Sequence, residues 1–143
     1  RGDDGPVVKI HDQRTLLLPD WRGNNRLDSL ENILEDGRVS LMFMVAGSNT
    51  VLRVNGTAVL SHDKQLLAHF EKAGVNPITV IIISIKEVYS QCARASMRAH
   101  LWSRDDSADL PSVGDLLKEA SDGNLGGAEY DSEWLPRAQK SMW

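Results

Sequence analysis

The run from Thr79 to Tyr89 constrains the fold of this chain most, because it is the longest segment that favours an extended backbone. It is rich in isoleucine and other β-branched residues, which pack well on a pleated sheet. Thr50 to Ser61 alternates between apolar and polar residues, whereas Met42 to Val45 is apolar without alternation and predicts a strand covered on both faces. Several strands of one sheet are therefore expected at the centre of the fold.

Shorter elements surround these strands. Val7 to Ile10 and Thr15 to Leu18 predict a hairpin with a turn at residues 11–14, and a further strand is expected from Arg38 to Val45. Helices are predicted at 63–72, 112–120 and 128–142, while residues 91–100 fit either a helix or an extended segment. Strands that come mostly before the helices predict a small antiparallel β-barrel with peripheral helices.

The helix ends carry local signals of their own. The third of the helices just named should kink or restart at Pro136, within its length, and the second should begin with a capping box of Ser112 and Asp115. A further helix follows the polar turn at residues 21–26, with Asn25 as its N-cap, Asp28 in the capping-box position and Gly37 as a left-handed cap at its end. Its predicted apolar face consists of Leu27, Leu30, Ile33 and Leu34.

Arg26 is unusual in this helix, because the positive end of the helix dipole disfavours a cation in the first turn unless an anion is bound there. The free N–H groups, the arginines and the neighbouring polar side chains predict a phosphate-binding turn; these side chains are Arg22, Asn24, Asn25, Arg26 and Ser29. The alternative is a solvated turn in which Asp20 and Asp28 neutralise the two arginines.

Composition narrows the class of protein. The 143 residues suit one domain, and a net charge of -4 argues against a general nucleic-acid binder. The apolar run from Val80 to Ile83 is too short to span a bilayer, so no membrane partner is expected. The single cysteine, Cys92, fits a reducing compartment and hence the cytoplasm. Because the chain begins at Arg1 in a turn-rich segment without methionine, we expect that N-terminal material precedes it.

Catalytic and metal-binding signatures are weak. The four histidines are scattered and show no metal-ligand spacing, so no metal site is predicted. Neither a nucleophile elbow nor a Walker sequence is present. Arginines next to strand ends in an acidic chain favour a small anionic ligand, and Trp102 offers an aromatic face to a planar ring. No catalytic residue is predicted.

Three segments carry a resemblance to a known family. The run Arg22-Gly-Asn-Asn-Arg-Leu-Asp-Ser-Leu-Glu-Asn-Ile-Leu34, then Gly37-Arg-Val39, and then Leu52-Arg-Val-Asn-Gly-Thr-Ala58 resemble the pyridoxamine 5′-phosphate oxidase-related FMN-binding proteins. The later segment from Cys92 to Trp102, with the ending around residues 110–114 and 128–131, is similar to one subgroup of them.

The resemblance implies a mainly β, six-stranded antiparallel split barrel with peripheral helices, which forms a homodimer and binds FMN at the subunit interface. It places the flavin phosphate at Asn24, Asn25, Arg26, Asp28 and Ser29. It also implies that Arg1 meets the phosphate or ribityl chain, that Arg53 lies on the strand facing the cofactor, and that Arg98 and Trp102 come from the other subunit. The family begins with a helix and a strand that this chain lacks before Arg1.

Two departures from the family limit the substrate. Residues 72–77 carry no arginine to hold a substrate phosphate, and residues 133–143 contain no Arg-x-His motif, which argues against vitamin B6 oxidation. We therefore expect an FMN-dependent oxidoreductase with an unidentified small-molecule substrate. The alternatives are a non-enzymatic module that stores or senses flavin, and a haem-binding protein with His100 as the candidate ligand.

Overall fold

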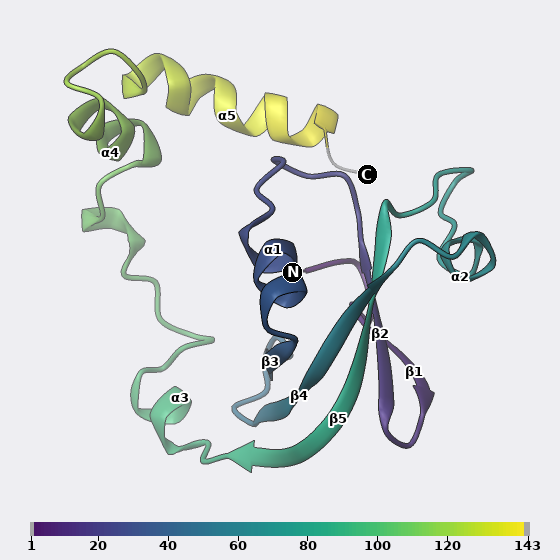
Figure 1. Ribbon diagram of the computed structural model, residues 1–143. Coiled ribbons are helices and arrows are strands. Elements are labelled where there is room, and N and C mark those ends of the chain that lie inside the picture. Colours follow the sequence, from purple (N-terminus) through teal and green to yellow (C-terminus); the bar gives the residue numbers. More distant parts are fainter. Residues whose placement is uncertain (1, 142–143) are drawn as a thin grey trace. The chain divides into compact units, whose positions relative to one another are not determined.

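One antiparallel sheet, with its five strands in the order β1-β2-β5-β4-β3, forms the framework of the first part of the chain (Figure 1). The computed structural model describes residues 2–141, in two units that divide after Trp102. The strands are β1 (Lys9–Asp12), β2 (Thr15–Asp20), β3 (Arg38–Phe43), β4 (Val51–Ser61) and β5 (Thr79–Gln91). β5 contains the isoleucine-rich run and pairs with both β2 and β4, so the predicted longest strand is confirmed as the middle of the sheet.

The hydrophobic core lies on one face of this sheet. Its buried members come from β2, β4 and β5, and they are Leu16, Leu18, Val54, Ala58, Ile81 and Ile83. Helix α1 (Asp28–Glu35) packs Leu30 and Ile33 against them, which confirms that part of the predicted helix face. The prediction is wrong for Leu27, which is 43% exposed as the residue before the helix, and for Leu34, which is 73% exposed because it lies beyond the edge of the stripe that meets the sheet.

Several element boundaries differ from those predicted. β1 runs through residues that the sequence assigned to the turn, and β2 continues through Pro19 to Asp20. Proline is tolerated there because β1 pairs with β2 only as far as Leu17, which leaves one edge of β2 open. β3 ends at Phe43 rather than Val45, and β5 extends to Gln91. Phe43 packs against the core, whereas Met42, Met44 and Val45 are exposed among the described residues, so the run is not covered on both faces as predicted.

Gly37 does not act as a left-handed cap, because its φ is not positive. Instead, Gly37 allows the backbone just before β3 to approach β4 closely. The Gly37 carbonyl accepts a hydrogen bond from the Ala58 amide at 2.6 Å, and a Cβ at Gly37 would lie 2.8 Å from the Ala58 carbonyl oxygen. A glycine is needed here for space rather than for backbone conformation.

The described residues confirm an antiparallel β-sheet with helices, but not a closed six-stranded barrel. They form five strands, with β1 and β3 at the two edges of the sheet. Two short helices belong to the same unit, α2 (Lys64–Ala68) with Asp63 as its N-cap and α3 (Arg94–Arg98). α2 is shorter than predicted, and α3 decides for the helical alternative in residues 91–100. None of the helices described is long and apolar enough to cross a membrane.

The second unit begins at Ser103 and contains helices only. They are η1 (Ser107–Asp109), α4 (Val113–Ala120) and α5 (Gly127–Ser141). The capping box of Ser112 and Asp115 is confirmed at the start of α4. α5 continues through Pro136 without a restart, and Met142, the predicted helix end, lies outside the described residues.

Candidate functional site: the polar turn before α1

The turn before α1 is held by its own backbone rather than by the predicted N-cap. The Asn24 side chain accepts a hydrogen bond from the Arg26 amide at 3.1 Å, and Asn25 adopts a left-handed conformation with φ 59°. Leu27 therefore becomes the N-cap residue, and no side chain caps the helix. The predicted Asn25 cap and its capping box with Asp28 are wrong, because the Asn24 turn and the left-handed Asn25 place the N-cap at Leu27, two residues after Asn25.

An uncapped helix start leaves backbone N–H groups that need an acceptor. Leu30 and Glu31 donate to the Leu27 carbonyl, so the amides of Asp28 and Ser29 are the ones without a helical acceptor. The Ser29 side chain is exposed beside them. This end of α1 therefore presents donors at the positive pole of the helix dipole, which is the arrangement that binds anions.

The two arginines of this turn differ in their interactions. The Arg26 guanidinium donates through Nε to Asp28 Oδ2 at 2.9 Å, with the two side chains 78% and 63% exposed. Here the neutralised-turn alternative holds for Arg26. Arg22 is exposed, and no ion pair of Arg22 is found among the described residues. Because an exposed ion pair contributes little, a doubly charged phosphate can compete with Asp28 for Arg26.

Arg53 lies on β4, half-buried, with Met42 and Tyr89 as its partners on the neighbouring strands. Its Nε donates to Gln91 Oε1 at 3.1 Å. Two residues along, the Asn55 side chain donates to Glu87 Oε2 at 2.7 Å. Alternate residues of a strand share a face, so these pairs make a polar strip on the side of the sheet opposite Val54 and the core.

Trp102 follows α3 and is fixed at one edge. Its indole N–H donates to the Ser48 carbonyl at 2.7 Å, in the loop between β3 and β4, while 42% of the residue stays exposed. Arg98 is the last residue of α3 and is exposed. His100, the candidate haem ligand, is exposed in the turn after α3 and has φ 50°.

The predicted site residues are thus in three places. Within one chain, none of the hydrogen bonds and ion pairs described joins the polar turn to Arg53, Arg98 or Trp102. Arg1 lies outside the described residues. The contiguous set at residues 24–29 is the one that the structure brings together around a single feature, the start of α1.

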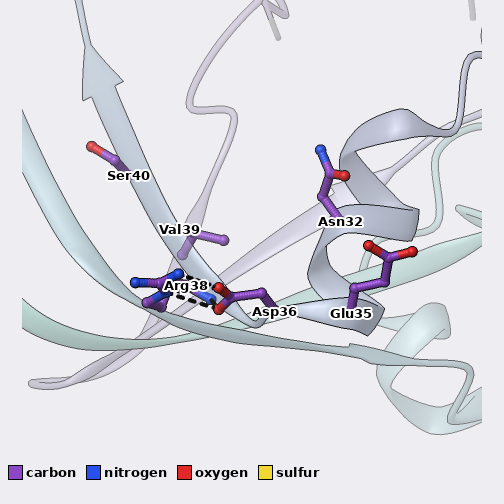
Figure 2. A pocket seen from close by; sticks show the side chains of 6 residues that line it. All are labelled: Asn32, Glu35, Asp36, Arg38, Val39 and Ser40. Carbon is purple, nitrogen blue, oxygen red and sulfur yellow. Dashed lines mark hydrogen bonds and ion pairs between the residues drawn. The ribbon is translucent and has the colours of Figure 1, made fainter.

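A hollow that sequence reasoning missed lies between the end of α1 and the start of β3 (Figure 2). It has a volume of about 460 Å³ and is lined by Asn32, Glu35, Asp36, Arg38, Val39 and Ser40. Arg38 Nε donates to Asp36 Oδ2 at 2.8 Å, and this hydrogen bond holds the pKa of the Asp36 carboxyl below its ordinary value. The sequence signal was Asp36 and Arg38 on either side of a glycine, which favours a local ion pair.

The hollow lacks the marks of a catalytic centre. Its carboxylate and guanidinium satisfy each other, so it offers neither a free base nor a free cation at Asp36 and Arg38. In the described part of the chain, no group of three or more histidine, cysteine or acidic residues is placed to hold a metal ion. The polar turn remains the better candidate for binding a charged ligand.

A comparison with models of known protein families identifies the family to which the chain belongs. Residues 1–92 match the family model described as pyridoxamine 5′-phosphate oxidase, and the chain therefore belongs to that family. The resemblance seen in the sequence is thereby confirmed. Similar solved structures include two of HupZ from Group A Streptococcus, one of them a single-residue variant, each 18% identical to this chain and covering 59% of it. The TM-scores are 0.45 and 0.44, and the matches cover 73% and 68% of those chains. A comparison with curated proteins found no match.

Proposed function

We propose that this chain binds FMN and uses it as an oxidoreductase acting on a small molecule. Two lines support the proposal: the family match over residues 1–92 and the chemistry of the polar turn. The observation that carries it is the uncapped start of α1 with two arginines beside it. A turn with unused amide donors and two exposed arginines has the donor set that a phosphate requires.

The turn would hold the FMN phosphate. Arg22 and Arg26 supply charge, the Ser29 hydroxyl and the first amides of α1 supply directed donors, and Asn24 and Asn25 shape the loop. Asp28, which pairs with Arg26, keeps the guanidinium over the first helical turn until phosphate competes for it. Losing one charge-assisted hydrogen bond of this kind costs about 1.5–3 kcal/mol.

A homodimer would complete the site. Met42, Met44 and Val45 at the end of β3 are exposed apolar residues, which a second copy can cover. In this arrangement Arg53 faces the cofactor from one copy, whereas Arg98 and Trp102 approach it from the other. Arg1, at the opposite end of the sequence, would join the phosphate or ribityl contacts.

Bound FMN supplies hydride transfer at its ring system, and the protein contributes orientation, hydrogen bonds and exclusion of water. The polar strip of Arg53 and Asn55 is suited to orient a ring with several carbonyl and nitrogen acceptors. A dedicated catalytic base is not required for this chemistry, so the absence of one from the prediction is consistent with the proposal.

Visible absorbance of the protein titrated with FMN tests the cofactor. Flavin bands that shift on binding support the proposal, a Soret band after addition of haem instead favours the haem alternative, and no binding of either contradicts both. Bleaching of the flavin by NAD(P)H without oxygen, followed by reoxidation with a substrate, separates an enzyme from a flavin store.

Light scattering tests the proposed dimer. A particle of twice 15.8 kDa is expected at micromolar concentration, because the apolar end of β3 needs a cover. A mass near 15.8 kDa with and without FMN would rule out the interface site.

A further inference from the structure

Lys72 connects three segments of the first unit. Its ammonium lies over the ring of Trp21, with Nζ 5.4 Å from the ring centroid, and it forms an ion pair with the carboxylate of Asp3. Indole is the aromatic ring that attracts a cation most strongly. The N-terminal segment, the loop after α2 and the residue that follows β2 therefore meet at one side chain, although they are far apart in the sequence.

The backbone on both sides of this contact is held by hydrogen bonds. Lys72 and Val75 exchange two backbone hydrogen bonds of 2.9 Å each, and the two residues between them have positive φ, as in a type I′ turn. On the other side, the Asp20 carbonyl accepts a hydrogen bond from the Ile78 amide at 2.9 Å. Lys72 therefore extends from a tight turn to a ring, Trp21, that is attached to the end of the sheet.

Trp21 is also the residue from which the polar turn starts. It is 7% exposed, whereas the next residue, Arg22, is exposed and belongs to the proposed phosphate site. A ring that is packed and held by a cation restricts the direction in which the chain leaves β2, and thereby the position of Arg22. A group that is already in place loses less conformational freedom when it binds, so its ligand is bound more tightly.

We propose that Lys72 is a positioning residue for the FMN phosphate: its ammonium, held by Asp3, fixes the Trp21 ring and so the start of the polar turn. The inference rests on the phosphate site proposed above. It requires no contact between Lys72 and the flavin, because the effect passes through Trp21 to the turn that follows it.

The affinities for FMN and for riboflavin test the proposal, because riboflavin has the same ring system without the phosphate. Lys72→Gln should bind FMN about two- to fivefold more weakly than the parent, the loss expected for one cation–π contact, and should bind riboflavin as the parent does. Lys72→Arg should restore most of the FMN affinity, since it keeps a cation at the ring. Lys64→Gln, which removes the same charge from the exposed start of α2, is the matched control and should bind FMN as the parent does.

A substitution of Asp3 separates positioning from overall charge. The hydrogen bond from Lys72 holds the pKa of the Asp3 carboxyl below its ordinary value, so this carboxyl is charged at neutral pH. Asp3→Asn removes a negative charge, which by itself would strengthen the binding of an anion. Positioning predicts the opposite, a loss of FMN affinity of about two- to fivefold, because the ammonium is no longer held over the ring. Asp4→Asn, at the neighbouring exposed carboxylate, is the control and should not weaken binding.

Three outcomes overturn the inference. Equal FMN affinity of Lys72→Gln and the parent shows that the contact does not position the turn, and it leaves the proposed function standing. An equal loss of affinity for FMN and riboflavin, with a lower melting temperature by circular dichroism, assigns Lys72 to the general stability of the fold. A parent that binds FMN no more tightly than riboflavin refutes the proposed phosphate site, and this inference with it.

Discussion

At Gly56 the structure predicts a large loss of stability when a side chain is added. It lies on β4 at an irregularity of the pairing, where Asn55 pairs with Glu87 and Gly56 with Ile85. A Cβ at Gly56 would lie 2.3 Å from the Ser84 carbonyl oxygen and 3.1 Å from its carbon. Both atoms belong to the backbone of the central strand, which is itself paired with β2, so neither can move without disturbing two strand pairs.

Gly56→Ala should therefore destabilise the protein near the upper end of the range for overpacking, about 3 kcal/mol. For a unit of about 100 residues each kcal/mol lowers the melting temperature by about 4–8 °C, so we expect a decrease of about 12–24 °C. Thermal unfolding followed by circular dichroism measures it. Gly23→Ala is the matched control, because its nearest atom would be 4.0 Å away and its φ is not positive. If both variants melt with the parent, the β4–β5 register described above is wrong.

Two further predictions concern other parts of the chain. Gly114→Ala places a Cβ 2.4 Å from the Gly127 carbonyl oxygen and 2.5 Å from Asp131 Oδ2, and it disturbs the 2.8 Å hydrogen bond from the Gly114 amide to Asp131. Amide hydrogen exchange should therefore become faster in residues 113–141 but not in the sheet. Unchanged exchange in both parts of the chain would contradict this packing. Arg38→Gln should raise the pKa of Asp36 toward its ordinary value in an NMR titration, because the Arg38 hydrogen bond is the main cause of its depression. Because the pKa of Asp36 is depressed in the folded state, the stability that this ion pair contributes is present at neutral pH and is lost as the pH falls through that pKa. If Asp36 titrates identically in Arg38→Gln and in the parent, the ion pair does not form in solution.

Features set by neighbouring residues were predictable from the sequence. The capping box of Ser112 and Asp115 needs only a spacing of three residues, and it forms. The core contacts of Leu30 and Ile33 follow from helical periodicity. The predicted N-cap at Asn25 does not form, because Asn24, one residue earlier, makes a competing local turn.

Features set by the approach of distant segments were not predictable. Gly37 fits either a left-handed cap or a close approach, and only its pairing with Ala58 decides between them. The polar turn was found because its residues are contiguous, whereas Arg53 belongs to a cross-strand strip that no short motif reveals.

The affinity for FMN of Arg26→Ala, compared with the parent, tests the central claim most directly. The parent must give up an exposed Arg26–Asp28 ion pair, worth about 0–1 kcal/mol, to gain a phosphate contact worth about 1.5–3 kcal/mol. Titration by flavin fluorescence should therefore show binding about tenfold weaker or more in Arg26→Ala. Arg14→Ala, which removes the same charge from the exposed turn between β1 and β2, should bind as the parent does. Equal affinity of Arg26→Ala and the parent would contradict a phosphate site at the start of α1.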